Sequence, residues 1–246
     1  MHIVYINLDR HHERRIRMDA LLQGLPFQRL AAVDGMRLPA TSSPLSPFEI
    51  ACLESHRQAA QLLVDSDAAH VCILEDDVHL GNEFAEFIRD ESWIPSGVDI
   101  IKLETMFQSV RLGQPVAARN RNLHRLYTRH HGAAGYILSR RGAQQLLTLT
   151  QNPQKPLDHI IFPDIAKQLT TLQISPALVI QDNVLARYQR NPVEILSSIQ
   201  QPKAKRSIGT ILLREGSRVV QHLRLALYRA SRGIYKLSKA AKVNFE

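Results

Sequence analysis

Short apolar segments rich in β-branched residues alternate along this chain with longer segments of helical character. The expected strands cover residues 2–8, 27–33, 71–74, 98–103 and 133–138, with shorter ones at 172–174 and 177–180. The expected helices cover residues 46–65, 82–90, 139–149 and 156–168. The first of these helices has a strong start, because Ser46 is a favoured N-cap, Pro47 follows it and Glu49 stands three residues after the cap. Such alternation predicts an α/β fold with a mostly parallel central sheet. Residues 105–131 are polar and irregular, and no order of elements follows from them.

Positive charge is concentrated at one end of the chain. Residues 202–246 hold 11 of the 31 Lys and Arg residues but only two of the 23 Asp and Glu residues. Residues 1–201 therefore hold 20 basic and 21 acidic side chains, which excludes a nucleic-acid-binding surface over this part. We expect two units, a globular body of residues 1–201 and a basic tail of residues 202–246.

The tail has the pattern of a basic amphipathic helix. At 100° per residue, most apolar side chains of residues 208–242 lie in one arc and most basic ones lie opposite. This pattern suits the surface of an anionic membrane. A helix packed on the body with its charged face in solvent is the alternative. Nucleic-acid binding is not expected, because the tail lacks Gly-Arg repeats and interleaved aromatic residues.

Cysteine content and hydropathy predict a cytoplasmic protein. The two cysteines, Cys52 and Cys72, are too few for a disulfide framework, so a reducing compartment is expected. Residues 3–6 form too short an apolar run for a signal peptide, and no segment approaches the roughly 20 apolar residues that a membrane span needs.

Three acids follow the apolar segment 71–74. Glu75, Asp76 and Asp77 would stand at the carboxyl end of a buried strand, where open α/β sheets bind their ligands. Neighbouring buried carboxylates repel one another, and a divalent cation with oxygen ligands would neutralise them. A solvated turn, in which an Asp caps the next helix, is the alternative.

Six short motifs occur along residues 1–180. They are Tyr5-Ile-Asn-Leu-Asp-Arg10, Ala32-Val-Asp-Gly35, Ile50-Ala-Cys-Leu-Glu-Ser-His56, Ile73-Leu-Glu-Asp-Asp-Val78, Gly132-Ala-Ala-Gly-Tyr-Ile-Leu-Ser-Arg140 with Gly142-Ala143, and Pro156-Leu-Asp158. In this order they resemble glycosyltransferase family 25, the lipooligosaccharide glycosyltransferases. The resemblance implies a GT-A-like nucleotide-diphosphosugar transferase fold. It also implies transfer of a hexose, commonly galactose, to a lipid-linked oligosaccharide core, with an acidic metal-binding motif and usually Mn²⁺.

On this interpretation the acids bind Mn²⁺ or Mg²⁺, which neutralises the departing diphosphate of a UDP-sugar. Asp77 is the favoured direct ligand, and Glu75 and Asp76 are further ligands or contacts to the sugar and ribose. Glu-Asp-Asp departs from a strict Asp-x-Asp motif, so the division of roles stays open.

Side chains after the first two strands are candidate nucleotide contacts. Asn7, Asp9, Arg10 and Asp34 could hydrogen-bond uracil or ribose, although Asp9 could equally cap a helix. Arg14 and Arg15 could bind the diphosphate or be solvated.

Two further residues are candidates at the substrate site. His56 shares a helix face with Cys52 and could be a packed polar residue, but the resemblance makes it a substrate contact. Lys102 ends a strand, where it could meet phosphate or solvent.

Asp158 is the candidate base that accepts the proton of the acceptor hydroxyl, and a capping role is its alternative. His159 could contact metal or substrate, and His130 and His131 could line the acceptor side.

The predicted function is inverting hexose transfer from a UDP-sugar at the cytoplasmic face of a bacterial inner membrane, where the tail holds the enzyme. The alternatives are another metal-dependent nucleotide-using transferase and a membrane- or nucleic-acid-binding adaptor with structural acids.

Overall fold

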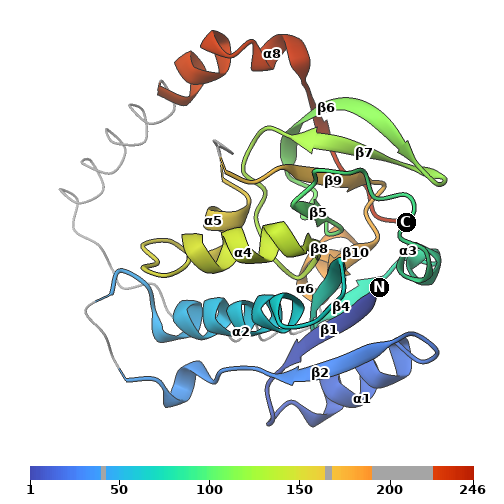
Figure 1. Cartoon of the computed structure of the whole chain (residues 1–246), viewed down its shortest axis with the longest axis vertical. Helices are drawn as coiled ribbons and strands as arrows, with labels where there is room; N and C mark the ends of the chain where they lie inside the picture. Colours follow the sequence, from blue (N-terminus) through green and yellow to red (C-terminus); the bar gives the residue numbers. More distant parts are fainter. Residues whose placement is uncertain (40–42, 164–167, 190–223) are drawn as a thin grey trace.

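A nine-stranded sheet forms the centre of the molecule in the computed structural model, which describes residues 1–39, 43–163, 168–189 and 224–246 (Figure 1). The strand order is β11-β6-β7-β9-β5-β8-β3-β1-β2. The strands are β1 (His2–Asn7), β2 (Phe27–Ala31), β3 (His70–Glu75), β5 (Ile100–Lys102), β6 (Ser109–Ala118), β7 (Arg121–Leu126), β8 (Gly135–Ser139), β9 (Thr171–Ser175) and β11 (Lys239–Lys242). A separate antiparallel pair consists of β4 (Val78–Leu80) and β10 (Val179–Gln181).

The sheet is mixed, although one strand direction predominates. The pairs β1–β2, β1–β3 and β5–β9 are parallel, and the other five neighbouring pairs are antiparallel. The strands β1, β2, β3, β5, β6 and β9 therefore run in one direction, and β7, β8 and β11 run in the other. The predicted α/β class and the predominant direction are confirmed, but the antiparallel insertion of β8 between β3 and β5 was not predicted.

Helices cover both faces of the sheet. On one face, α2 (Pro47–Val64), α4 (Arg140–Leu149) and α5 (Leu157–Ile161) pack against residues such as Val4 and Ile73. On the other face, α1 (His12–Leu21) and α3 (Phe84–Arg89) pack against Tyr5 and Leu74, which directly follow Val4 and Ile73 in β1 and β3. Both faces of β1 and β3 are thus buried, which explains their continuous apolar sequences.

The helix starts follow the predicted chemistry. Ser46 accepts a hydrogen bond from the Glu49 amide, and the Glu49 side chain accepts one from the Ser46 amide, which completes a capping box. Ser139 caps α4 by accepting from the Gly142 amide. The rigid start of α2 holds the helix that carries Cys52 and His56.

Residues 105–131, which the sequence left unordered, form the β6–β7 hairpin at one side of the sheet. The pairing shifts in register between Leu112 and Pro115, and several β6 side chains are exposed. An exposed, irregular strand lacks the apolar alternation that identifies strands from sequence.

The C-terminal residues of the predicted tail join the body. The strand β11 extends the sheet antiparallel to β6, and Val243 is buried. The Thr105 hydroxyl donates to the Val243 carbonyl at 2.6 Å, and the Ala177 amide donates to the Asn244 carbonyl at 2.7 Å. The prediction of a helix through residue 242 is therefore wrong from residue 239 onward, because sheet pairing determines the conformation there.

Only part of the predicted tail helix lies among the described residues. Residues 224–231 are helical, and α8 (Ile234–Leu237) follows them. The predicted boundary at residues 201 and 202 lies outside the described residues, so the division into two domains stays a prediction.

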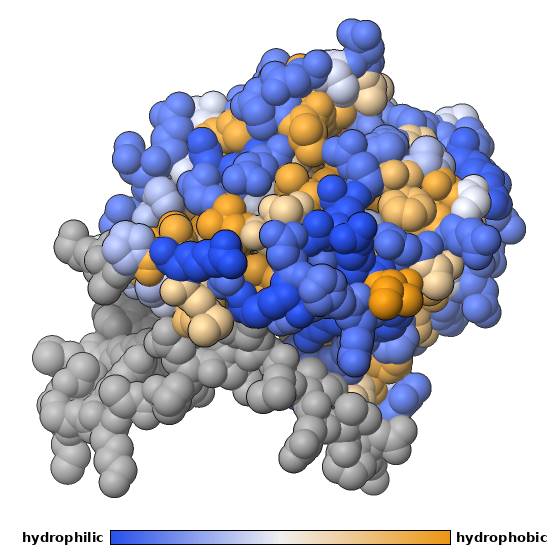
Figure 2. All heavy atoms as spheres, turned by 90° about the horizontal axis from the view of Figure 1, so that it is seen from below, coloured by the Kyte–Doolittle hydropathy of each residue, from blue (hydrophilic) through white to orange (hydrophobic). Residues whose placement is uncertain are grey.

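One face of the molecule is mostly hydrophilic. Figure 2 shows one face on which hydrophobic residues occur in small, scattered groups. In the described part of the chain, no helix is both long enough and apolar enough to cross a membrane.

Candidate functional site

A pocket lies at the edge of the sheet where β1, β2 and β3 end. Strand ends and α2 supply its walls, as the carboxyl-edge rule for open α/β sheets predicts. One part is apolar, with Leu8, Ala32, Val33, Phe48 and Ala51; the rest is polar, with Arg10, His11, Arg14, Cys52, Ser55, His56, Glu75, Asp76, Asp77 and Gln181.

Asp76 lies among donors from the N-terminal part of the chain. It accepts a hydrogen bond from the Asn7 side chain at 2.7 Å and forms an ion pair with Arg14 at 2.8 Å. Both carboxylate oxygens of Asp76 are therefore engaged, one by each donor. This arrangement makes Asp76 a less available cation ligand than its two neighbours.

Glu75 and Asp77 share one donor and repel each other. The amide nitrogen of Gln181 lies 3.2 Å from Glu75 Oε2 and 3.2 Å from Asp77 Oδ1. Burial, with the neighbouring Asp76, raises the pKa of Glu75 to about 7. Burial, with the charge of Glu75, raises the pKa of Asp77 to about 7. Two neighbouring carboxylates, Asp77 buried and Glu75 half-buried, fit a divalent cation with oxygen ligands.

The four predicted nucleotide contacts have different environments. Arg10 lines the pocket and pairs with Asp34, whose carboxylate also accepts from the Met36 amide. Asn7 is buried beneath Asp76 and positions it. Asp9 lies at the exposed surface in an ion pair with Arg29. The capping alternative for Asp9 is wrong, because α1 begins after His11.

The two candidate arginines of α1 are also separated. Arg14 lines the pocket through its pair with Asp76. Arg15 is half-exposed and faces Asp19 on its own helix. One arginine of the two is thus in position to meet a bound anion.

His56 lies in the wall of the pocket. Its Nδ1 lies 2.9 Å from the Tyr136 hydroxyl, and its Nε2 lies 3.4 Å from Glu75 Oε1. Burial lowers the pKa of His56 to about 4, so its ring is neutral at pH 7.

Lys102 corrects the sequence-based prediction. Its side chain is fully buried, donates to Glu104 at 3.0 Å and to the Gly132 carbonyl at 2.5 Å, and lies 4.2 Å from the centre of the Phe162 ring. It is therefore neither solvated nor free to meet a phosphate. The reason is Glu104, which stands two residues beyond the end of β5 and pairs with the ammonium group.

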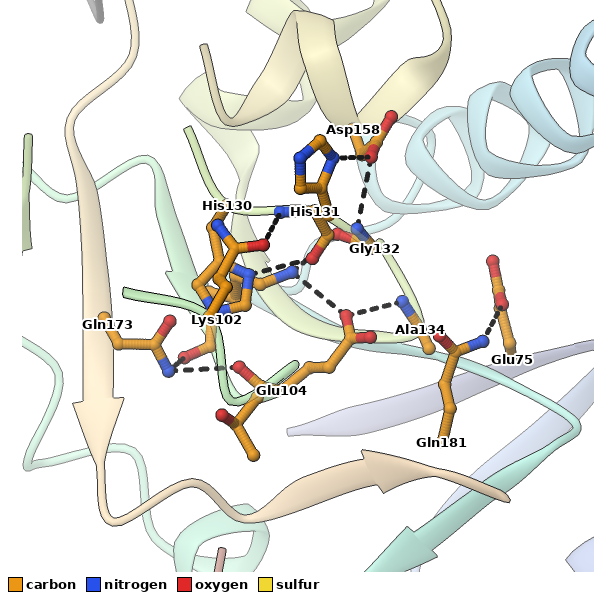
Figure 3. Close-up of polar contacts among 12 residues, drawn as sticks. Glu75, Lys102, Glu104, His130, His131, Gly132, Ala134, Asp158, Gln173 and Gln181 are labelled. Atoms are coloured by element: carbon orange, nitrogen blue, oxygen red, sulfur yellow. Dashed lines mark hydrogen bonds and ion pairs between the residues drawn. The ribbon is translucent and has the colours of Figure 1, made fainter. Parts of the chain in front are cut away.

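The Lys102–Glu104 pair supports the loop that contacts Asp158, as Figure 3 shows. Lys102 holds the Gly132 carbonyl, and Glu104 Oε2 accepts from the Ala134 amide at 3.0 Å. The Gly132 amide in turn donates to Asp158 Oδ2 at 3.1 Å. Gly132 has φ +81°, and a Cβ there would lie 2.4 Å from Glu104 Oε1, so both backbone and space require glycine.

Asp158 stands in the first turn of α5, as predicted, and Pro156 is the N-cap. Its Oδ2 lies 3.6 Å from His131 Nδ1, and the rings of His131 and His159 are 5.5 Å apart. His130 is buried and contacts the His131 carbonyl at 2.8 Å, so of the two neighbouring histidines only His131 is exposed.

Gln181, Tyr136 and Glu104 were missed as functional residues. Gln181 and Tyr136 contact predicted residues from distant parts of the chain. Gln181 stands in no pattern typical of a site, and Tyr136 lies within the motif of residues 132–140, where it was not singled out. Glu104 had one signal, its spacing of two residues from Lys102.

We expect Lys102→Met to destabilise the protein by about 3 kcal/mol, because removing one partner leaves the other buried without its counter-ion. Burial already raises the pKa of Glu104 to about 7, so proton uptake by Glu104 limits this loss. Urea denaturation measures the change. The double variant Lys102→Met/Glu104→Gln should recover part of the stability, and the exposed Lys155→Met should change it by less than about 0.5 kcal/mol. A Lys102→Met variant as stable as the wild type would contradict the inferred pairing.

Comparisons with known proteins agree with the motifs. The model of glycosyltransferase family 25, described as LPS biosynthesis proteins, matches residues 1–161. The chain is 30% identical to the lacto-N-neotetraose biosynthesis glycosyltransferase LgtB of Neisseria gonorrhoeae, over 74% of this chain and 75% of that protein. It is 27% identical to the lipooligosaccharide biosynthesis protein lic2B of Haemophilus influenzae, over 87% of this chain and 90% of that protein. A solved glycosyltransferase involved in glycosylation of the PBCV-1 major capsid is 11% identical with a TM-score of 0.44, over 77% of this chain and 96% of that one.

Proposed function

Because the chain belongs to glycosyltransferase family 25, we propose that it transfers a hexose, galactose in our expectation, from a UDP-sugar to a lipid-linked lipooligosaccharide core. Membership in the family makes the chain an enzyme, so the adaptor alternative is wrong. The names of its relatives, which include lipooligosaccharide biosynthesis proteins, support an oligosaccharide acceptor.

The observation that carries the proposal is the pairing of Glu75 and Asp77 inside the pocket. Their two carboxylates share the Gln181 donor, and Asp77 is buried while Glu75 is half-buried, which supports a cation site between them. They would hold Mn²⁺ or Mg²⁺. When bound, this cation would neutralise the negative charge of the departing diphosphate. Asp76, engaged by Asn7 and Arg14, keeps this part of the chain in place.

The remaining pocket suits a nucleotide. The apolar walls near Ala32, Val33 and Phe48 offer contact to a flat base, and the guanidinium groups of Arg10 and Arg14 lie on the polar side. We place the uridine against the apolar walls and the diphosphate between the arginines and the acids. In this placement the nucleotide lies at the carboxyl ends of β1, β2 and β3, as expected for a GT-A-like fold.

Asp158 is our proposed base for an inverting reaction. Its carboxylate accepts hydrogen bonds from the Gly132 and His159 amides, which fix its orientation. In a single displacement, the acceptor hydroxyl attacks the anomeric carbon, its proton passes to a carboxylate oxygen of Asp158, and the UDP leaves with the bonding electron pair.

The function is tested by incubating the purified protein with UDP-Gal, UDP-Glc and their N-acetyl forms, with a lipooligosaccharide core acceptor, in Mn²⁺, Mg²⁺ or EDTA. We expect transfer of one hexose, with inversion at its anomeric carbon, that depends on a divalent cation. No transfer and no hydrolysis with any UDP-hexose would refute the proposal.

We further propose that helical residues near the C-terminus contact an anionic membrane. Leu227 is 65% exposed in the helical residues 224–231, which also carry Arg224 and Arg229. Such a contact would raise the local concentration of a lipid-linked acceptor.

We expect Leu227→Glu to weaken binding to vesicles of anionic lipid about tenfold or more, since it removes an apolar contact and adds repulsion. Vesicle co-sedimentation measures the change. The matched control is Val116→Glu, which alters an apolar residue that is 54% exposed in β6. Equal vesicle binding by wild type and Leu227→Glu would exclude this surface.

A further inference from the structure

One wall of the pocket carries three different metal-binding side chains. Cys52 and His56 come from α2 and Glu75 from the end of β3, and one potential ligand atom of each lies within 4.8 Å of the others. We propose that these residues form a binding site for a zinc-type cation, which adjoins the site of the acid pair and shares Glu75 with it: Oε1 of Glu75 lies toward His56, and Oε2 lies at the Gln181 amide that also contacts Asp77. The proposal does not depend on the transfer reaction.

The spacing of the donors fits tetrahedral coordination. With bonds of about 2.0–2.1 Å, a nitrogen and an oxygen ligand of tetrahedral zinc lie roughly 3.4 Å apart. His56 Nε2 and Glu75 Oε1 are 3.4 Å apart. Cys52 stands four residues before His56 in the same helix, so its sulfur lies one turn away on the same face. The sulfur lies within 4.8 Å of the other two ligand atoms.

Neighbouring side chains hold two of these ligands in the required orientation. The Tyr136 hydroxyl lies 2.9 Å from His56 Nδ1, which leaves Nε2 directed at Glu75. The Gln181 amide donates to Glu75 Oε2 at 3.2 Å and leaves Oε1 directed at His56, as Figure 3 shows for the Gln181–Glu75 contact. Partners of this kind orient the ligands of protein metal sites.

The donor chemistry of this site differs from that of the acid pair, although both include Glu75. A thiolate and an imidazole favour zinc over the hard cations Mg²⁺ and Mn²⁺, which prefer oxygen ligands. All three residues line the pocket, so the fourth coordination position opens toward it. Cation binding would release the Cys52 proton, and the resulting thiolate and Glu75 carboxylate would balance the two charges of the metal.

Cobalt(II) gives a direct test, because cobalt–thiolate bonds absorb in the near ultraviolet and tetrahedral cobalt absorbs in the visible. We expect the full-length protein to develop both bands at one equivalent of Co²⁺ and to lose them when Zn²⁺ is added. Cys52→Ser should abolish the thiolate band and weaken Zn²⁺ binding by more than the roughly 10- to 100-fold cost of losing an outer partner. Cys72→Ala is the matched control, since Cys72 is buried on the other face of β3, and it should keep both bands.

Asp77→Asn distinguishes the two sites. It should retain the cobalt–thiolate band while it loses stabilisation by Mn²⁺ in thermal denaturation, and Cys52→Ser should do the reverse. Absence of a thiolate band in the wild type, or its survival in Cys52→Ser, would overturn the proposed site. Neither result would bear on sugar transfer, which the donor screen tests separately.

Discussion

Asp77→Asn should lower hexose transfer by about a thousandfold, which corresponds to roughly 4 kcal/mol of lost transition-state stabilisation. The amide cannot replace a charged oxygen ligand, although it has almost the same shape and can still accept from Gln181. Initial rates with saturating UDP-sugar and Mn²⁺ measure the loss. The matched control is Asp67→Asn, which neutralises an exposed acid beyond α2 and should leave the rate within about twofold.

The same substitution has an opposite expected effect on stability. Burial and the charge of Glu75 disfavour ionisation of Asp77, so removing its charge relieves a repulsion in the cation-free protein. We therefore expect Asp77→Asn to unfold at a higher temperature than the wild type in EDTA at pH 8. Loss of activity with a lower unfolding temperature would instead indicate damage to the fold. A rate within threefold of the wild type would exclude Asp77 as a cation ligand.

Local signals in the sequence were enough for the elements that build the pocket. The capping residues Ser46 and Glu49 determined the start of α2, and an apolar segment that ends in three acids identified the end of β3. These signals lie within a few residues of one another, so they are recognisable in the sequence without knowledge of tertiary contacts. The predicted acids, His56 and Arg10 meet in the pocket because β1, β3 and α2 come together at this edge of the sheet.

The contacts that define each acid's role could not be predicted in this way. Gln181 reaches Glu75 and Asp77 from more than 100 residues away in the sequence. Tyr136 reaches His56 from 80 residues away. Register in the sheet determines these pairings, and the antiparallel position of β8 was not apparent from its apolar residues. The same reason explains Lys102, whose strand end was predicted but whose burial depends on β8 and β9 on either side.

The C-terminal segment illustrates how charge alone misleads. The residues Lys239–Lys242 belong to a basic region, yet they pair with β6, because a strand at the edge of a sheet has unpaired backbone groups. Lysines are well tolerated at such an edge, where their side chains reach solvent. The positive charge of the chain therefore does not identify a single surface.

Asp158→Asn should lower kcat by about 10²–10⁴-fold, the usual contribution of a general base. The KM for the UDP-sugar should change by less than about twofold, because Asp158 does not line the pocket of the acids. Steady-state kinetics with varied donor at saturating acceptor measure both constants. The control His159→Asn removes the neighbouring ring, keeps the amide that donates to Asp158, and should cost less than about tenfold.

A positioning role for Asp158 would give a different pattern. Asn has one acceptor oxygen, so it can keep only one of the hydrogen bonds from the Gly132 and His159 amides. If Asp158 only holds the loop, hydrogen exchange at Gly132 should rise and activity should fall in proportion. If it is the base, Asp158→Ala should regain activity with added formate, because a small carboxylate can enter the space and accept the proton. If formate does not restore activity and the KM for the donor is raised, Asp158 has a structural role in the loop. The reason is that a free carboxylate can accept the proton but cannot hold the loop in place.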